Sequence, residues 1–259
     1  MKHTNQLTYN QITFSYTDDP NIAEREIHLY HELLFYLDGD AVFLSENSQQ
    51  ILQSASLLVI PKETYHFFKL QKSKRFLRLK IAIPHATAES LPLQTLFSQL
   101  RIFSPLSKPL QGILNRLCQA LQETGDEMAG FHAYAALLML LSELILSDSG
   151  GIGPNAIGSG FIPEVVAYVN DHLSDTLSAA ALSAQLNVSA SSITHTFKKE
   201  LGISLHQYIT QKRMMHAQRL LAEQKLPTKI FIDCGYRDYS SFYKAYINFF
   251  GHPPSQNNI

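Results

Sequence analysis

The stretch that decides the fold of this chain is LSAQLNVSASSITHTFKKELGISLHQY, residues 182–208. It begins inside a short predicted helix, after which Asn187-Val188 provides a tight turn. Ser189 is a favoured N-cap residue and begins a second helix, which Gly202 ends because glycine readily takes the left-handed conformation of helix C-termini. Ser204 caps the helix that follows. Two short helices joined by a tight turn form a helix-turn-helix unit.

A second unit of the same kind is predicted further along the chain. A long helix covers residues 205–221, and the short helix Thr228–Cys234 follows it. Gly235-Tyr236 then makes a turn, and Asp238 caps a last helix, Tyr239–Phe250. The pattern predicts an all-α domain of two helix-turn-helix units joined by one long helix.

A segment rich in glycine and serine, residues 148–160, precedes this all-α part. No hydrophobic period runs through it, and its composition is that of a flexible linker. The 259 residues, of which 45% are hydrophobic, are therefore predicted to form two globular domains, 1–147 and 161–259. Residues 161–259 carry 9 Lys and Arg against 7 Asp and Glu, whereas the whole chain has a net charge of −1. This difference is the one expected if only the second domain meets phosphate.

Period-two alternation of apolar residues dominates the first domain. Asp38-Gly39-Asp40 is typical of a hairpin turn, and many short strands with turns between them predict a small antiparallel barrel or sandwich. Two helices follow the strands, so the predicted class is α+β. The predicted strands lie in Ile12–Tyr16, Ile27–Leu37, Ala41–Leu44, Leu57–Ile60 and Leu77–Ile83, and the predicted helices in Leu110–Leu121 and Phe131–Leu146.

The cysteines and the apolar segments favour a cytoplasmic protein. Cys118 and Cys234 form no paired motif and are expected to be reduced thiols. Residues 1–10 are polar and lack the apolar core of a signal peptide. The longest apolar stretch, Ala133–Leu146, is interrupted by Ser142-Glu143 and is too short to span a bilayer. We expect it to be a buried helix and expect no membrane partner.

The 182–208 stretch, with Phe197-Lys198-Lys199 and Gly202 in their usual order, resembles the first helix-turn-helix of the AraC/XylS family of transcription regulators. Gly235-Tyr236 and the segment 251–254 resemble the second unit, and the resemblance covers the whole chain. It implies a sequence-specific DNA-binding regulator that is not an enzyme. The implied partners are double-stranded DNA, a second copy of the chain, a small-molecule effector and RNA polymerase.

Polar residues near the N-terminus of each recognition helix are the candidates for reading base edges in the major groove. Lys and Arg would instead contact phosphates, which give affinity but carry no sequence information. The second unit departs from the family pattern at Phe231, where a small residue is usual. The candidate base-reading residues are Ser191, Ser192, Thr194, His195, Ser240, Ser241 and Lys244, and the candidate phosphate contacts are Lys198, Lys199, Lys212, Arg213 and Arg237.

Two segments of the first domain resemble the cupin-like sensor domain of this family. His28-Leu-Tyr-His-Glu32 leads by a fixed step to Gly39, and Pro61-Lys-Glu-Thr-Tyr-His66 is similar to the second cupin motif. The resemblance implies a cupin-like barrel with an effector pocket, followed by a helical pair that dimerises. The candidate pocket residues are His28, Glu32, Tyr36 and His66.

The same histidines raise an alternative from another class, a cupin-fold metal-dependent enzyme with a helical appendage. Such a site needs at least three His or Glu ligands on one inward face. Position 26 is Glu26, so the usual His-x-His pair is missing. On an unbroken strand His28 and Glu32 share a face, while His31 points the other way. We therefore expect no metal, cofactor or catalytic residue, and expect a pocket that hydrogen-bonds an effector.

Overall fold

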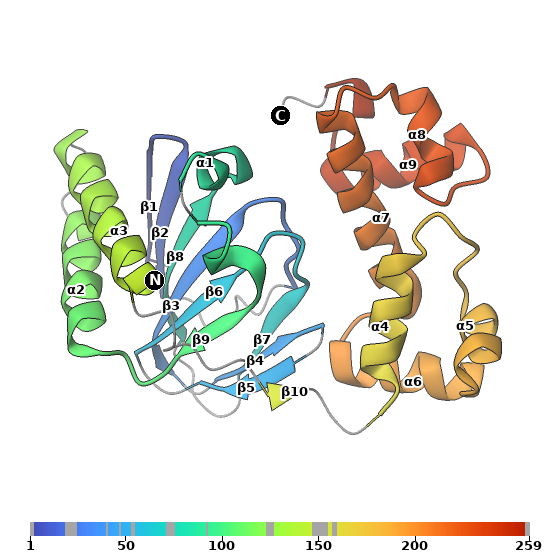
Figure 1. Ribbon diagram of the computed structural model, residues 1–259, viewed down its shortest axis with the longest axis horizontal. Coiled ribbons are helices and arrows are strands. Elements are labelled where there is room, and N and C mark those ends of the chain that lie inside the picture. The colour runs from blue at the N-terminus through green and yellow to red at the C-terminus, as the bar shows by residue number, and fades with distance from the viewer. Residues whose placement is uncertain are drawn as a thin grey trace. The chain divides into compact units, whose positions relative to one another are not determined.

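The computed structural model describes residues 3–18, 25–39, 41–46, 48–52, 55–70, 76–91, 93–122, 127–146, 155–156 and 160–256. It divides the chain into two compact units, Met1–Ala156 and Ile157–Ile259, and each is described by itself (Figure 1). Most of the predicted linker, and the predicted turn residue Asp40, lie outside the described residues. Within the linker, Asn155–Ala156 (β10) pairs with Gln49 and Ser48, a strand that the sequence did not predict.

Two antiparallel sheets and a pair of long helices build the N-terminal unit. The larger sheet has the strand order β1-β2-β8-β3-β6-β9, and the smaller has the order β10-β5-β4-β7. The strands are β1 (His3–Tyr9), β2 (Ile12–Asp18), β3 (His31–Gly39), β4 (Ala41–Ser45), β5 (Ser48–Ile51), β6 (Ser56–Ile60), β7 (His66–Leu70), β8 (Phe76–Ile83) and β9 (Arg101–Phe103). The helices are α1 (His85–Glu89), a short 3₁₀ turn (Leu96–Ser98), α2 (Lys108–Gln122) and α3 (Glu127–Leu146).

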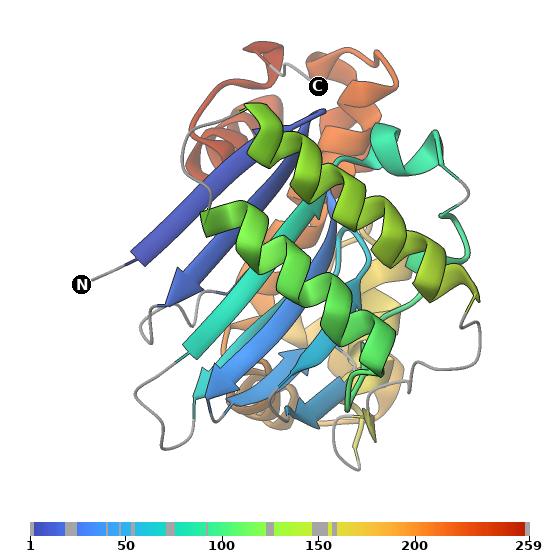
Figure 2. The same cartoon turned by 90° about the vertical axis from the view of Figure 1, so that its left-hand side faces the viewer.

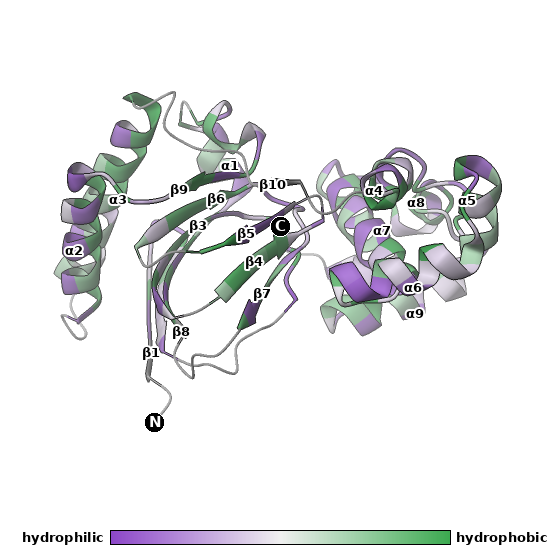
Figure 3. Ribbon diagram, turned by 90° about the horizontal axis from the view of Figure 1, so that it is seen from below, coloured by the Kyte–Doolittle hydropathy of each residue, from purple (hydrophilic) through white to green (hydrophobic). Residues whose placement is uncertain are grey.

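The larger sheet lies between two other layers of the N-terminal unit. Helices α2 and α3 run across its outer face (Figure 2), and the smaller sheet faces it from the other side (Figure 3). Alternate residues of β3 serve the two cores: Leu33 and Phe35 join the core under the helices, whereas Leu34 and Tyr36 join the core between the sheets. Successive side chains of a strand point to opposite faces, so β3 is buried on both sides.

Strand β3 is shorter than the sequence predicted. It begins at His31 rather than Ile27, because the chain bends at Leu29-Tyr30. Upstream of the bend, Glu26 forms an isolated antiparallel bridge with His66. Strand β1 was not predicted at all, since its residues are mostly polar, yet it pairs with β2 along its whole length.

Helix α3 has apolar side chains on its exposed side as well as on its buried side. Met128–Leu146 is long and apolar enough to cross a membrane by length and composition. This corrects the expectation, drawn from Ala133–Leu146 alone, that the stretch is too short to span a bilayer. One side of α3 packs into the core under the larger sheet through Ala133, Leu137 and Leu140. The exposed side carries Met128, Phe131, Leu138, Met139, Ile145 and Leu146, which we call the α3 apolar stripe.

The C-terminal unit consists of helices and turns in the residues described, and its helices begin where the sequence predicted except α8, which begins at Pro227 rather than Thr228. Ser189, Ser204 and Asp238 each accept a hydrogen bond from the backbone N–H three residues further on. Gly202 and Gly251 end helices in the left-handed conformation. The helices are α4 (Ile162–Asp171), α5 (Ala179–Leu186), α6 (Ala190–Leu201), α7 (Leu205–Ala222), α8 (Pro227–Asp233) and α9 (Tyr239–Phe250), followed by a 3₁₀ turn (Pro254–Gln256).

Residues near both ends of α7 pack against other helices of the C-terminal unit. Near its start, the rings of Phe197 on α6 and Tyr208 on α7 meet edge to face, with centroids 5.3 Å apart. Near its end, Met214 and Ala217 join a core with Phe242 of α9 and residues of α8. Cys118 and Cys234 are free thiols, as predicted.

Candidate nucleic-acid interface and a buried polar cluster

The polar candidates on α6 lie on its exposed face. Ile193 and Phe197, four residues apart, are fully buried and fix which side of the helix faces outward. Ser191, Ser192, Thr194 and His195 are exposed, and so are Lys198 and Lys199 in the last turn. A shallow hollow runs over this face and is lined by Ala190, Ser191, Thr194, His195, Lys198 and Lys199. Thus α6 presents hydroxyl and imidazole groups in its first two turns and two cations at its end.

Helix α9 presents a similar but less basic face. Phe242 and Tyr246 are buried, as expected from the sequence, and Ser240, Ser241 and Lys244 are exposed. The Ser241 hydroxyl donates to Asp238 Oδ2 at 2.9 Å, and the Ser241 backbone N–H donates to Oδ1 at 2.8 Å. These two hydrogen bonds hold the pKa of Asp238 below its usual value. Ser241 is therefore engaged in capping α9, whereas Ser240 and Lys244 remain available at the surface.

Phe231 is accommodated in the second unit by packing. Its ring lies edge to face against Tyr239 of α9, with centroids 6.3 Å apart, and it packs against the core shared by α7, α8 and α9. The large side chain at this position is thus part of the contact between α8 and α9.

Two of the five predicted phosphate contacts have partners inside the fold. Lys212 is 8% exposed, and its ammonium lies 5.6 Å from the centre of the Tyr208 ring. Arg213 donates from Nε to Leu173 O at 3.0 Å and from Nη2 to Asp175 O at 2.7 Å. The phosphate role assigned to these two residues is therefore not retained, because their charged groups are taken up by packing and by backbone carbonyls. Lys198, Lys199 and Arg237 are exposed.

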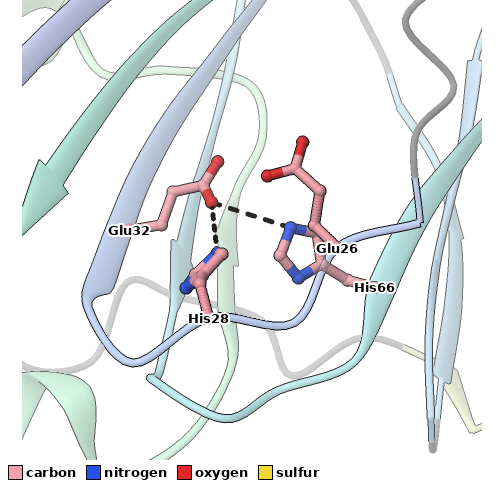
Figure 4. A group of neighbouring side chains, drawn as sticks. All are labelled: Glu26, His28, Glu32 and His66. Carbon is pink, nitrogen blue, oxygen red and sulfur yellow. Dashed lines mark hydrogen bonds and ion pairs between the residues drawn. The ribbon is translucent and has the colours of Figure 1, made fainter. Parts of the chain in front are cut away.

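A cluster of four titratable side chains lies inside the N-terminal unit (Figure 4). Glu26, His28, Glu32 and His66 each bring one nitrogen or oxygen within 4.8 Å of the others. We call these residues the buried cluster. Glu26 and His28 come from the segment before β3, Glu32 from β3 and His66 from the start of β7. The sequence placed three of these together and missed Glu26, which reaches the cluster through its bridge to His66.

One carboxylate oxygen is the centre of the buried cluster. Glu32 Oε2 lies 2.8 Å from His28 Nε2 and 3.6 Å from His66 Nε2. The Nδ1 atoms of the two rings face backbone carbonyls, Tyr30 O at 2.9 Å and Thr64 O at 3.0 Å respectively. Both imidazoles are therefore held with Nε2 directed at the same oxygen.

The charges on β8 compensate the carboxylates of the cluster. The Lys80 ammonium pairs with Glu26 and lies 3.4 Å from Glu32 Oε2, and Arg78 lies 3.4 Å from Glu26. Burial alone would raise the pKa of Glu32, but the charge of Lys80 and the hydrogen bond from His28 outweigh it and hold that pKa below its usual value. Burial is also the main reason that the pKa of His66 is lowered. Lys80 is the cation that lies close to both Glu26 and Glu32, so its positive charge balances the two carboxylates.

A polar pocket of about 540 Å³ adjoins the buried cluster on the inner face of β2 and β8. None of the predicted pocket residues His28, Glu32, Tyr36 and His66 lines it, because all four are buried behind it or in the core between the sheets. The polar residues alternating along β2 and β8 were the sequence signal for this pocket. Its lining residues are Gln6, Gln11, Thr13, Ser15, Thr17, Glu26, Tyr30, Arg78, Lys80, Ala82 and Pro84.

Helices α6 and α9 each expose a polar face and each follow a short helix and a turn, which is the arrangement of a DNA-binding protein of the helix-turn-helix class. A family model described as a helix-turn-helix domain matches residues 182–257. The Msm operon regulatory protein of Streptococcus mutans is 24% identical over 247 residues, covering 93% of this chain and 86% of that protein. The arabinose operon regulatory protein of Salmonella typhimurium is 23% identical over 227 residues, covering 84% and 79%.

Other matches cover only about a third of this chain. The probable transcriptional regulator LumQ of Photobacterium leiognathi is 33% identical over 90 residues, which are 34% of this chain and 36% of that protein. The solved C-terminal domain of AraT, a response regulator from Geobacillus stearothermophilus, is 29% identical, covers 38% of this chain and 84% of that chain, and has a TM-score of 0.37. The helix-turn-helix match and the relatives that span most of the chain show that this protein is a DNA-binding transcriptional regulator, similar to regulators of the AraC/XylS family.

Proposed function

We propose that this regulator reads DNA with α6 and α9 in the major groove, and that α6 supplies most of the sequence preference. The observation that carries the proposal is the exposed face of α6. Ser192 and His195 are presented near its N-terminus, where recognition helices reach base edges, and Lys198-Lys199 follows where phosphates would lie. The proposed domain arrangement is 1–147 and 161–259 around the linker 148–160, in a cytoplasmic protein.

The polar pocket is the proposed effector site, within an N-terminal domain of the cupin-like barrel type. Hydroxyl, amide, carboxylate and two cationic groups line a volume of about 540 Å³, which suits a small molecule with several hydroxyl groups. The named relatives include a regulator of an arabinose operon, and a sugar has that chemistry. An effector acts only by binding one arrangement of the protein better than another.

The α3 apolar stripe is the proposed homodimer surface. Monomeric proteins rarely expose large contiguous apolar patches, and a two-fold interface pairs one patch with its own copy. The only charged residues of α3 are Glu127 and Glu143, so two copies of the stripe meet with little repulsion. Contact with RNA polymerase stays a prediction of the family resemblance. The enzyme alternative is not proposed, because the relatives that span most of the chain are named as regulators.

To test DNA reading, the full-length protein is incubated with fragmented genomic DNA from the source organism and washed at rising salt concentration. The DNA that is retained is then sequenced. We expect a few enriched sites. On such a site, Ser192→Ala or His195→Ala should reduce the preference over unrelated DNA by about 1–3 kcal/mol. Lys198→Ala should weaken binding to every sequence and reduce the salt slope by about one unit.

Two matched variants control for general damage to the domain. His206→Ala removes another exposed histidine, and Lys225→Ala removes an exposed lysine that pairs with Glu223 at 3.0 Å. Neither should change the preference or the salt slope. Equal loss of preference in His195→Ala and His206→Ala would show that α6 does not read the bases.

A further inference from the structure

The two histidines of the buried cluster have a defined tautomer. A backbone carbonyl can only accept a hydrogen bond, so the Nδ1 atoms that contact Tyr30 O and Thr64 O must carry protons. In the neutral ring, the other nitrogen, Nε2, then carries a lone pair. Both Nε2 atoms are directed at Glu32 Oε2, which is also an acceptor. With both rings neutral, lone pairs therefore face one another, and this conflict is removed either by a second proton on a ring, through which His28 would donate to Glu32, or by a bound cation.

Two buried atoms of the cluster lack a hydrogen-bond partner. They are Glu32 Oε1 and His66 Nε2, in side chains that are 0% and 1% exposed. Buried polar atoms are normally paired, and leaving a buried acceptor without a partner is unfavourable. One unsatisfied nitrogen and one unsatisfied oxygen in the same cluster are the atoms that a bound cation would satisfy.

We propose that Glu26, His28, Glu32 and His66 bind one divalent transition-metal ion, such as Zn²⁺, Mn²⁺ or Co²⁺. Two imidazole nitrogens and two carboxylate oxygens form a donor set that suits these ions. Each histidine donates its other ring N–H to a carbonyl, which is how metal-ligating histidines are commonly oriented. The four donor atoms lie within 4.8 Å of one another, and ligands around such an ion are about 3.4 Å apart, so only small shifts are needed, with His28 Nε2 and Glu32 Oε2 moving apart from 2.8 Å.

Lys80 is the competitor of the metal for this site. Its ammonium pairs with the carboxylates of both Glu26 and Glu32, and supplies their positive charge when no metal is bound. A divalent ion must displace it from Glu32. Lys80 also lines the polar pocket, so the displaced side chain has open space to enter. The metal ion and the Lys80 ammonium therefore compete for the same carboxylates, and the measured metal affinity reflects this competition. Removing the charge of Lys80 should strengthen metal binding.

The experiment is a titration of untagged, chelator-treated, full-length protein with Co²⁺, followed by visible absorption and by metal analysis after dialysis. We expect one Co²⁺ per chain with a ligand-field band, which Zn²⁺ abolishes by competition. Glu32→Gln and His66→Ala should each weaken Co²⁺ binding at least about tenfold. Lys80→Met should tighten it about tenfold. His85→Ala removes a histidine outside the cluster and should leave binding unchanged.

Circular dichroism of each variant reports whether the chain is folded, and folded variants decide the outcome. Absence of a band in both the wild type and folded Lys80→Met would overturn the proposal, because the four side chains would then bind no metal ion even without competition from Lys80. A wild-type band that survives folded His66→Ala at unchanged affinity would overturn it as well, because the metal would lie elsewhere. Neither result bears on DNA binding, which is measured separately.

Discussion

Three segments of the C-terminal unit converge on the backbone of Gly235. Its φ angle is +73°, and a Cβ atom there would lie 2.3 Å from Leu173 O and 2.4 Å from Arg213 Nη2. The Arg213 guanidinium donates to the carbonyls of Leu173 and Asp175 and lies 5.5 Å from the centre of the Tyr236 ring. Arg213 thus links α7, the segment after α4 and the turn after α8. Only glycine fits between them.

We expect Gly235→Ala to destabilise the C-terminal unit by about 3 kcal/mol or more. The left-handed conformation costs an alanine roughly 1–2 kcal/mol, and the contact with the rigid Leu173 carbonyl adds to it. Gly251→Ala is the matched control, because its φ is +76° and a Cβ there meets nothing within 4 Å. Urea unfolding followed by helical circular dichroism measures both variants. Equal losses would show that the contact with Leu173 is without energetic consequence.

At the level of elements, the C-terminal helices were predictable because local residues specify their ends. Ser189 caps α6 and Gly202 ends it, and neither signal depends on distant parts of the chain. Strand β3 was less predictable. Its period-two pattern continues upstream through Ile27 and Leu29, although the chain bends there, because apolar residues of a bend can also be partly buried. Only pairing with neighbouring strands fixes where such a strand begins.

The candidate sites show the same difference between local and long-range information. The exposed face of α6 followed from its helical period. The burial of Lys212 did not, because it depends on which helices pack around α7. Glu26 joins the buried cluster through a bridge to His66, which is 40 residues away along the chain. Sequence spacing placed His28 beside Glu32, but through an assumed strand that is in fact a bend.

Helix α3 gives a prediction about the oligomeric state. If its apolar stripe is the homodimer surface, Met139→Glu should place a charge opposite its own copy, because a two-fold interface duplicates every residue. We expect the wild type to be a dimer at micromolar concentration, and Met139→Glu to dissociate at least about a hundredfold more readily, as buried like charges require. Sedimentation equilibrium measures both.

The control for the dimer prediction is Ile232→Glu, which changes an exposed apolar residue of α8 in the other unit. This variant should remain dimeric. A monomeric wild type, or a Met139→Glu variant that dimerises as the wild type does, would contradict the assignment of the stripe.

On the scale of the molecule, the C-terminal unit sets the spacing at which DNA would be read. Helix α7 has 18 residues and is therefore about 27 Å long. It carries α6 at its start and the α8–α9 pair near its end. Successive major-groove segments on one face of DNA are about 34 Å apart, and the widths of the helices beyond both ends of α7 add to its length. A rigid α7 thus matches one turn of DNA.

This spacing predicts the footprint of one protomer. Hydroxyl-radical cleavage on an enriched site should show two protected segments about 10 base pairs apart on one face of the DNA. The double variant Ser240→Ala with Lys244→Ala removes the exposed polar groups of α9 and should lose protection of one segment only, because α6 remains intact. His195→Ala should weaken the other segment instead. A wild-type footprint confined to a single segment would show that α9 does not enter the groove, and that Phe231 and the packing around it hold the second unit away from DNA.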